Sequence, residues 1–139
     1  MVHTTIPRGG FPLTLSTVNI QGIAQLSIPV RDIARASLFY NKTLGLPLLF
    51  SQSNMALLDC HGIRLLLGIP EKPEDHPSSV VYFKVADIEG TYRSLLADEV
   101  EFTSKPHKIA EFNGFAVWMA FFKDPDDNVH ALTSEVPIA

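Results

Sequence analysis

Cysteine is almost absent from this chain, since Cys60 is the only one among 139 residues. A single thiol cannot form an intrachain disulfide, and it cannot supply a multi-cysteine metal site. Proteins of oxidising compartments commonly pair several cysteines, whereas free thiols are typical of the reducing cell interior. We therefore expect a cytoplasmic protein without a structural disulfide.

The sequence is also poor in positive charge and in long apolar runs. Eleven Lys and Arg residues stand against 15 Asp and Glu, which gives a formal net charge of −4. Nucleic acids and anionic membrane surfaces need clustered Lys and Arg, so neither is an expected partner. No apolar run approaches a membrane span, and the first residues lack the basic region and apolar core of a secretory signal.

What is present is the composition of one packed globular domain, with 46% hydrophobic and 19% charged residues. A strand is predicted over Ala24–Ile28, where apolar and polar residues alternate and Gln25 faces away from the apolar side. Asp32 stands where a helix N-cap belongs. Apolar residues then recur at helical spacing from Ile33 to Leu44, and Gly45 is placed to end the helix.

The same plan returns in the second half of the chain. A strand is predicted over Val80–Ala86, Asp87 is the cap, and a helix is predicted over Ile88–Ala97. The Val-x-Asp-Ile motif of residues 30–33 recurs at residues 85–88, so that position 30 matches position 85, an offset of 55 residues. A fixed offset between two strand–cap–helix units indicates an internal duplication.

Short apolar runs separated by turn residues complete each unit as strands. The predicted strands are Pro47–Gln52, Met55–Cys60 and Ile63–Gly68, then Val100–Thr103, Phe115–Lys123 and Asn128–Thr133. The chain therefore divides into an N-terminal arm (1–20), a first βαβββ module (21–70), a linker (71–79) and a second βαβββ module (80–135), forming one compact domain. We expect an α+β fold in which two curved sheets surround a cup and the helices lie outside.

This ordered set of motifs resembles the vicinal oxygen chelate superfamily, which includes glyoxalases, bleomycin resistance proteins and extradiol dioxygenases. The resemblance extends from Ile23 to Glu135. Its carriers are Val30-x-Asp32-Ile33, Phe39-Tyr40, Leu44-Gly45-Leu46, Phe83-x-Val85-x-Asp87-Ile88 and the turn from Phe122 to Asn128. The turn has Asp127 where the family usually has glycine. The resemblance implies the cup as a small-molecule site and a homodimer as the assembly.

In metal-using members of this family the ligands come from four strands that face the cup. Those positions hold Gln25, Leu66, Val80 and Ala131 here, and only Gln25 has a donor atom. A divalent cation needs several protein ligands, so we expect no metal and no cofactor at these positions. A rearranged metal site of His61, His107 and His130 stays open as an alternative, although strand alternation sends His130 to the face opposite Ala131.

Strand alternation from those four positions predicts the residues that line the cup. The predicted ligand-binding residues are Gln25, Ser27, Arg64, Leu66, Val80, Tyr82, Val117, Met119, Phe121 and Ala131. Trp118, Ala120 and Phe122 should face the helix instead. An inward guanidinium of Arg64 requires a partner, and we favour an Asp or Glu of the protein over a ligand anion. Residues Ser104–Gly114 are expected to form a loop over the mouth, with Lys108, Glu111 and Phe112 as contacts.

An apolar cup with few polar anchors favours a metal-independent small-molecule binding protein of this superfamily. The alternative is a glyoxalase- or dioxygenase-like enzyme with rearranged or missing metal ligands. A metal-free enzyme that uses Tyr82 or Arg64, and a cup that is filled by its own side chains, also stay open. No catalytic residue is assigned, and the sequence does not decide whether the chain is an enzyme.

Overall fold

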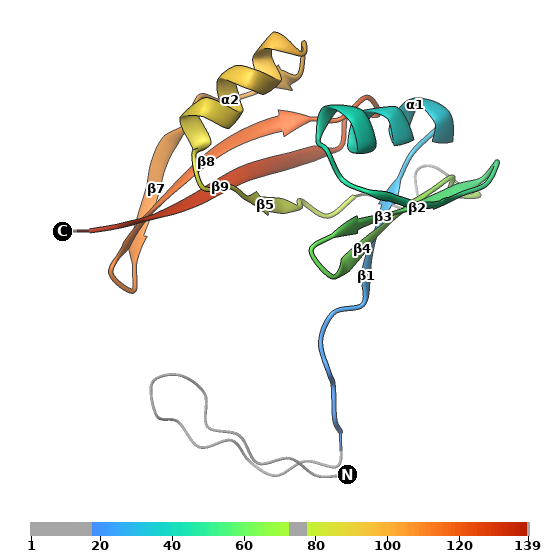
Figure 1. Ribbon diagram of the computed structural model, residues 1–139, viewed down its shortest axis with the longest axis horizontal. Coiled ribbons are helices and arrows are strands. Elements are labelled where there is room, and N and C mark those ends of the chain that lie inside the picture. Colours follow the sequence, from blue (N-terminus) through green and yellow to red (C-terminus); the bar gives the residue numbers. More distant parts are fainter. Residues whose placement is uncertain (1–17, 73–77, 139) are drawn as a thin grey trace.

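The computed structural model describes residues 18–72 and 78–138. Most of the expected arm (1–20) and the middle of the expected linker (71–79) therefore lie outside the described residues. Two modules of the βαβββ plan follow one another in the described chain, each with its own sheet, and the second has one additional strand. Figure 1 shows the helices of both modules on the same side of the two sheets. The predicted α+β architecture is confirmed.

The first module forms a four-stranded sheet. Its strands follow the order β1 (Gln25–Pro29), β4 (Ile63–Gly68), β3 (Met55–Cys60) and β2 (Leu48–Ser51). β1 and β4 are parallel, and β3 is antiparallel to both of its neighbours. The short apolar runs of the sequence therefore become strands close to their predicted bounds.

The helical segment of this module changes type along its length. Helix α1 (Ile33–Leu38) begins after Asp32, whose carboxylate accepts from the Arg35 amide at 3.1 Å, as the sequence predicted. It continues as a π-helical turn, η1 (Phe39–Thr43), in which the Leu44 amide donates to the Phe39 carbonyl at 2.9 Å. Gly45 then adopts a φ of +79°, which suits the glycine stop expected there.

The second module forms a five-stranded sheet beneath helix α2 (Ile88–Ala97). The Asp87 carboxylate caps this helix by accepting from the Gly90 amide at 3.0 Å. The strand order is β5-β9-β8-β6, and β7 also pairs with β8. The strand bounds are β5 Tyr82–Lys84, β6 Glu101–Phe102, β7 His107–Phe112, β8 Phe115–Lys123 and β9 Val129–Pro137.

The prediction of a loop over Ser104–Gly114 is wrong, because β7 occupies most of that stretch and pairs antiparallel with β8. Asn113 and Gly114 connect the two strands with φ values of 54° and 82°. Two consecutive positive φ values are what a tight hairpin turn requires, and Asn-Gly is the sequence that supplies them most readily. Every residue of β7 is exposed, so its polar composition looked like that of a loop.

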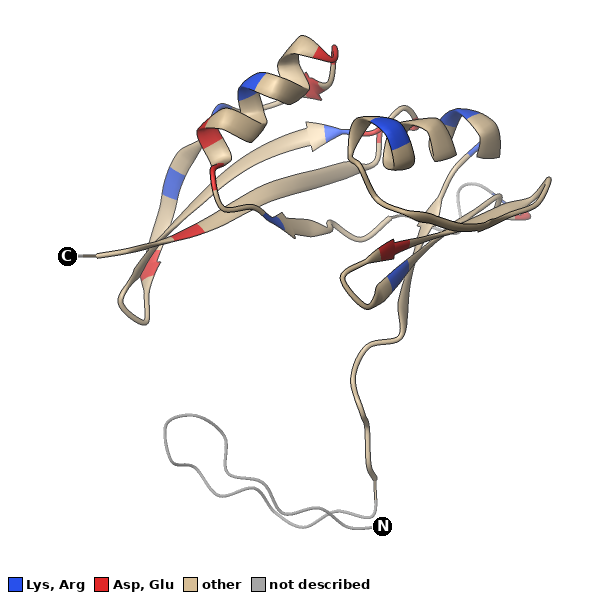
Figure 2. Cartoon of the chain, viewed as in Figure 1, with Lys and Arg blue, Asp and Glu red and all other residues tan. Residues whose placement is uncertain are grey.

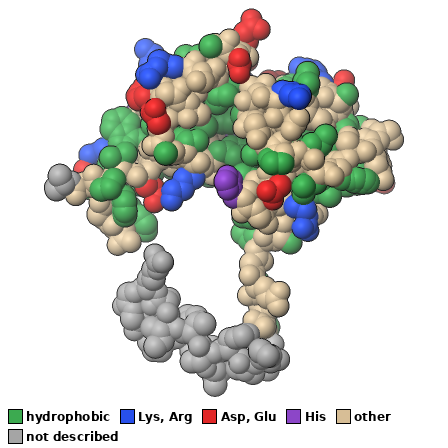
Figure 3. All heavy atoms as spheres, in the orientation of Figure 1, with side chains coloured by type: hydrophobic (Ala, Val, Ile, Leu, Met, Phe, Trp, Pro, Cys, Tyr) green, Lys and Arg blue, Asp and Glu red, His purple; other side chains and the backbone are tan. Residues whose placement is uncertain are grey.

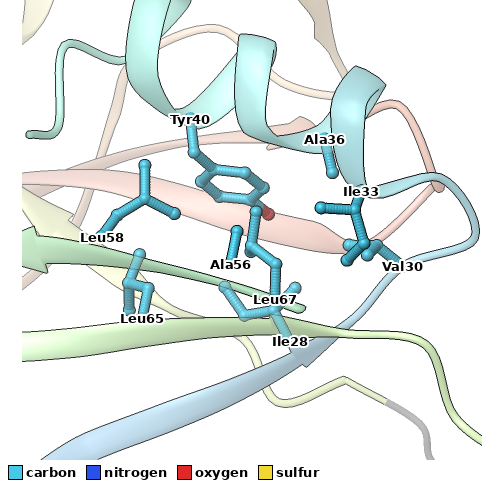
Figure 4. Packing of buried hydrophobic residues seen from close by; sticks show 9 residues of the cluster. All are labelled: Ile28, Val30, Ile33, Ala36, Tyr40, Ala56, Leu58, Leu65 and Leu67. Atoms are coloured by element: carbon cyan, nitrogen blue, oxygen red, sulfur yellow. The ribbon is translucent and has the colours of Figure 1, made fainter. Parts of the chain in front are cut away.

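Helix α1 and the sheet of the first module bury each other's apolar faces. Figure 4 shows side chains from α1, η1 and three strands meeting in one cluster. The cluster consists of Ile28, Val30, Ile33, Ala36, Tyr40, Ala56, Leu58, Leu65 and Leu67. It also includes the residues that alternate with Arg64 and Leu66, so those two side chains point to the sheet's other face.

A second cluster lies between α2 and its own sheet, and it joins the first. Its buried members are Ile88, Leu95, Val100, Ala120, Phe122 and Leu132. Trp118 packs against it, which confirms the predicted helix-facing positions of β8. Phe39, Leu44 and Phe83 pack against both clusters. The two modules therefore share one continuous apolar layer on the helix side.

A buried polar chain crosses that layer and connects the modules. The Tyr40 hydroxyl of the first module donates to Asp124 Oδ2 at 2.6 Å and lies 2.7 Å from His130 Nε2. The Val81 amide donates to His130 Nδ1 at 3.3 Å. Because Nδ1 accepts, the neutral ring carries its proton on Nε2 and donates it to the Tyr40 oxygen. All donors then point one way, from Val81 through His130 and Tyr40 to Asp124.

The protonation states in this chain follow from its burial. Burial raises the pKa of the Tyr40 hydroxyl far above its usual value, and the negative charge of Asp124 raises that pKa further. Burial lowers the pKa of His130, and the Asp124 carboxylate, 4.0 Å from Nε2, opposes that shift without cancelling it. Tyr40 and His130 are therefore both neutral at pH 7, as a buried hydrogen-bonded pair requires.

The turn of residues 124–128 also forms hydrogen bonds with the first module. Arg31 donates to Asp126 Oδ1 through its amide at 3.0 Å and its Nε at 3.1 Å. The Asn128 side-chain amide donates to the Pro29 carbonyl at 2.8 Å. Within the turn, Asp127 has a φ of 64°, so it occupies the conformation for which glycine is usual.

The charged residues of the folded chain are not separated by sign. Figure 2 shows basic and acidic residues interspersed along the described chain. No helix in the part of the chain that the structure describes is long and apolar enough to cross a membrane.

Replacing Tyr40 with Phe should lower the free energy of unfolding by about 2 kcal/mol, because it leaves the His130 Nε2–H and one Asp124 oxygen lone pair buried without the hydroxyl. Urea unfolding followed by circular dichroism measures this change. Tyr92→Phe is the matched control, since this partly exposed ring packs on Phe102, and it should change stability by less than about 0.5 kcal/mol. Equal effects of the two variants would contradict the assigned chain.

Stability should rise with pH across the window below the ordinary His pKa of 6.5. The unfolded state binds a proton there while folded His130, with its lowered pKa, does not. The contribution of His130 is thus complete above about pH 6.5 and is lost as the pH falls toward the lowered folded value. Urea unfolding of wild type and His130→Gln between neutral and mildly acidic pH tests this. Identical pH slopes in the two proteins would refute the assignment.

Candidate functional site

The first half of the predicted cup lies on the face of the first sheet that turns away from α1. Gln25 pairs with Arg64 in the β1–β4 register, and Ser27 pairs with Leu66. Neighbouring residues in register share a face, so these four side chains form one patch. Arg64 Nε donates to Gln25 Oε1 at 3.3 Å. The structure therefore brings all four predicted residues of the first module together.

The partner of Arg64 differs from the expected one. The sequence favoured an Asp or Glu, but Arg64 makes no ion pair among the described residues, and its hydrogen bond goes to an uncharged amide. Asp59 lies opposite Arg64 in the β3–β4 register, yet its Oδ1 accepts from the Gly62 amide of the hairpin turn at 3.1 Å. Arg64 is exposed, so water solvates its charge and no carboxylate is required.

The second half of the predicted cup lies on the corresponding face of the second sheet. Ala131 is the register partner of both Tyr82 on β5 and Phe121 on β8. The rings of Tyr82 and Phe121 meet edge to face with centroids 6.3 Å apart. Ala131 is fully buried beside them, whereas the Tyr82 side chain is 51% exposed. Met119 and Val117 continue the same face along β8.

The two halves stay on separate sheets. No strand of the first sheet pairs with a strand of the second among the described residues. Val80, which the duplication matches with Gln25, precedes β5 by two residues and is 40% exposed. The predicted residues therefore form two patches, one polar with Arg64 and Gln25, and one aromatic with Tyr82 and Phe121.

Sequence reasoning missed several residues that share these faces. Lys84 and Thr133 pair in the β5–β9 register two residues beyond Tyr82 and Ala131, and Glu135 is opposite Val117. His107 is opposite Met119 because β7 is a strand and not a loop. The Asn113-Gly114 pair was the signal that could have placed His107. Lys84 and Thr133 lie inside their predicted strands, so alternation could have found them, whereas Glu135 needed the observed length of β9.

The donor set does not fit a resident metal at the family's four positions. Leu66, Val80 and Ala131 carry no donor atom, and the single donor oxygen of Gln25 accepts from a guanidinium, whose charge would repel a cation. The three histidines of the alternative site do not converge. His61 lies in the β3–β4 turn with a φ of 50°, His107 lies on β7, and His130 is buried on the helix side. No group of three or more His, Cys, Asp and Glu side chains in the described chain could hold a metal ion.

The other side chains considered as reactive or ligand-contacting groups show no sign of activation. Burial raises the pKa of the Cys60 thiol and the nearby charge of Asp59 raises it further, which keeps the sulfur protonated. Lys108 and Glu111 form an ion pair with each other on exposed β7, and Phe112 projects into solvent with 69% exposure. None of these groups has the features of an activated nucleophile or base.

Comparison with known proteins agrees with this fold. The family model described as glyoxalase/bleomycin resistance protein/dioxygenase superfamily matches residues 22–132. The uncharacterized protein YraH of Bacillus subtilis (strain 168) is 28% identical over an alignment of 122 residues, and the match covers 77% of this chain and 93% of that protein.

Solved structures show the same likeness. A superfamily member from Sphaerobacter thermophilus DSM 20745 superposes with a TM-score of 0.71 at 24% identity, covering 84% of this chain and 98% of that one. TnmS3, an antibiotic binding protein from Streptomyces sp. CB03234, gives a TM-score of 0.68 at 24% identity, covering 85% and 98%. The family match over most of the sequence, together with the two βαβββ modules, means that this chain belongs to the glyoxalase/bleomycin resistance protein/dioxygenase superfamily.

Proposed function

We propose that this chain is a metal-independent binding protein for a small organic molecule, which the cup faces of its two sheets hold. The observation that carries the proposal is the pairing of Gln25 with Arg64. At the position where the family keeps a metal ligand, this chain uses the donor oxygen to orient a cation. The other three positions are apolar, which suits the wall of an organic-ligand pocket.

The chemistry of the two patches indicates the kind of ligand. The guanidinium of Arg64 has five N–H donors, and the hydrogen bond to Gln25 uses only one. The remaining donors suit a carboxylate or carbonyl group of the ligand. The Tyr82–Phe121 edge-to-face pair, with Met119 beside it, suits a flat apolar portion. A neighbour of the same fold, TnmS3, is described as an antibiotic binding protein, which supports the binding of small molecules as one use of this architecture.

The second candidate is a glyoxalase- or dioxygenase-like enzyme with rearranged metal ligands. It is favoured only by the family itself, because members of one fold carry out different reactions. Among the residues of the described chain, exposed His107 and Glu135 on the cup side of the second sheet would be the donors to examine.

We also propose a cytoplasmic homodimer. The edge strand β2 presents three consecutive apolar residues, Leu48, Leu49 and Phe50, with exposed fractions of 43%, 55% and 37%. Unpaired strand edges and contiguous apolar patches are usually covered in soluble proteins. A second copy of the chain is the occupant that the family resemblance implies.

Ligand binding is tested by a thermal-shift screen of aromatic carboxylates and planar carbonyl compounds. A ligand present at 100 times its Kd should stabilise the native state by about 2.7 kcal/mol, which raises the melting temperature. Arg64→Gln should weaken binding about tenfold through loss of a charge-assisted hydrogen bond. Arg93→Gln is the matched control, because Arg93 lies exposed on α2 and away from both patches. The proposal fails if no compound binds, or if both variants bind like wild type.

Metal content, measured by mass spectrometry on protein purified without chelator, separates the two candidate functions. The binding-protein proposal expects substoichiometric divalent metal. A stoichiometric metal that disappears in Gln25→Ala or His107→Ala would establish the second candidate instead.

Sedimentation equilibrium across the micromolar range tests the homodimer, with a mass of two chains expected. Leu49→Lys should shift the protein toward one chain, because it places a charge on the apolar edge of β2. Leu38→Lys, at a residue of α1 that is 62% exposed, should leave the dimer intact. A wild-type protein that sediments as one chain throughout the range would exclude the dimer.

A further inference from the structure

A cavity lies between the two modules. Its volume is about 660 Å³, within the usual range of roughly 300–1,000 Å³ for small-molecule sites. Residues 43–46, Cys60 and His61 of the first module form one wall, and β5 and α2 of the second module form the other. Figure 3 shows a hollow between the two modules, with hydrophobic side chains inside it. None of the ten predicted cup residues lines it.

The floor of this inter-module cleft is apolar and is shared by the modules. Leu44 and Phe83 line the cleft, and they are two of the residues that pack against both hydrophobic clusters. Leu95 and Leu132 extend the floor from the second cluster. An apolar molecule seated here would therefore contact both modules at once.

The rim of the cleft has one cation whose charge is not matched, Lys84 of the edge strand β5, which the β5–β9 register places where the cleft meets the cup face. Lys84 makes no ion pair with any residue that the structure describes. The rim also contains the Asp87 carboxylate, but this group accepts from the Gly90 amide and caps the amino end of α2, where the helix dipole offsets its charge. Thr43 and Ser94 add hydroxyl groups on either side. The open polar position on the rim is thus suited to an anion.

We propose that the inter-module cleft is a separate binding site for a small apolar molecule that carries one carboxylate or sulfonate. Lys84 pairs with the anionic group, and Leu44, Phe83 and Leu132 enclose the apolar body. None of the ten residues predicted for the cup lines the cleft, so this site is tested separately from the function proposed for the cup. Its occupant would brace the two modules against each other.

The single cysteine supplies a direct readout of this site. Cys60 lines the cleft and is the only thiol of the chain, so the rate of its reaction with a maleimide reports on the cleft alone. The probe is anilinonaphthalene sulfonate, an apolar aromatic sulfonate whose fluorescence increases in apolar surroundings. Saturating probe should slow Cys60 modification at least fivefold.

Variants assign the binding to individual residues. Lys84→Gln should weaken probe binding about fivefold, which is the scale of one partly solvated ion pair. Lys105→Gln, at an exposed lysine away from the cleft, is the matched control and should bind like wild type. Ser94→Phe, at an exposed position of α2 on the rim, should exclude the probe by occupying the cleft while leaving both hydrophobic clusters unchanged.

Three outcomes would overturn the proposal. They are absence of probe binding, an unchanged Cys60 reaction rate with probe bound, and equal affinities of Lys84→Gln and wild type. Arg64→Gln distinguishes the two sites, since loss of probe binding in that variant would place the probe in the cup and not in the cleft. Equal melting temperatures of the variants without probe show that each is folded.

Discussion

The arrangement of the two modules depends on one buried chain of hydrogen bonds, from the Val81 amide through His130 and Tyr40 to Asp124. Tyr40 belongs to the helical segment η1 of the first module. In the second module, Val81 precedes strand β5, Asp124 lies in the turn before β9, and His130 lies on β9. Burying these polar groups would be costly if any one lacked its partner, because each would lose its hydrogen bonds with water. The chain is satisfied only when η1 and β9 lie at one separation. These hydrogen bonds therefore fix the position of one module relative to the other. The shared apolar contacts of Phe39, Leu44 and Phe83 stabilise the interface through buried area but do not select one orientation.

The same chain of hydrogen bonds explains why the helical segment changes to a π-helical turn at Phe39. In the π turn the Leu44 amide reaches the Phe39 carbonyl five residues earlier, which adds one residue to that turn. Tyr40 then points into the core at 0% exposure and still reaches the second module with its hydroxyl. Irregular helical turns of this kind commonly stand at positions that a specific contact requires.

The sequence predicted the helix side of the molecule well and the cup side less completely. Periodicity places Ala120 and Phe122 in the core, and the caps Asp32 and Asp87 begin their helices as predicted, because these signals act within a few residues. The alternation that put His130 opposite Ala131 is correct for the same reason. The His130–Tyr40 contact spans 90 residues, so no local pattern could reveal it. Strand β7 was predicted as a loop, because the polar composition of its exposed residues is typical of a loop. The Asn113-Gly114 pair indicates the hairpin turn that the structure has. The prediction of a carboxylate partner for Arg64 was wrong, because strand alternation tells which face a side chain is on but not how far it is exposed to solvent.

This difference between the two sides has a physical cause that bears on function. Residues that face the helices are held by close packing, where a change of one methylene is felt. Exposed residues on the other face of the same strands, such as Gln25 and Arg64, contribute little to the core, so substitution there changes stability little. Gln25 and Ile28 lie on one five-residue strand, yet only Ile28 is buried. Such exposed positions can therefore change their chemistry at small energetic cost, whereas fully buried Ala131 cannot. The pairing of Gln25 with Arg64 lies in this variable layer, where a hydrogen bond can set the chemistry of the sheet surface without a contribution to the core.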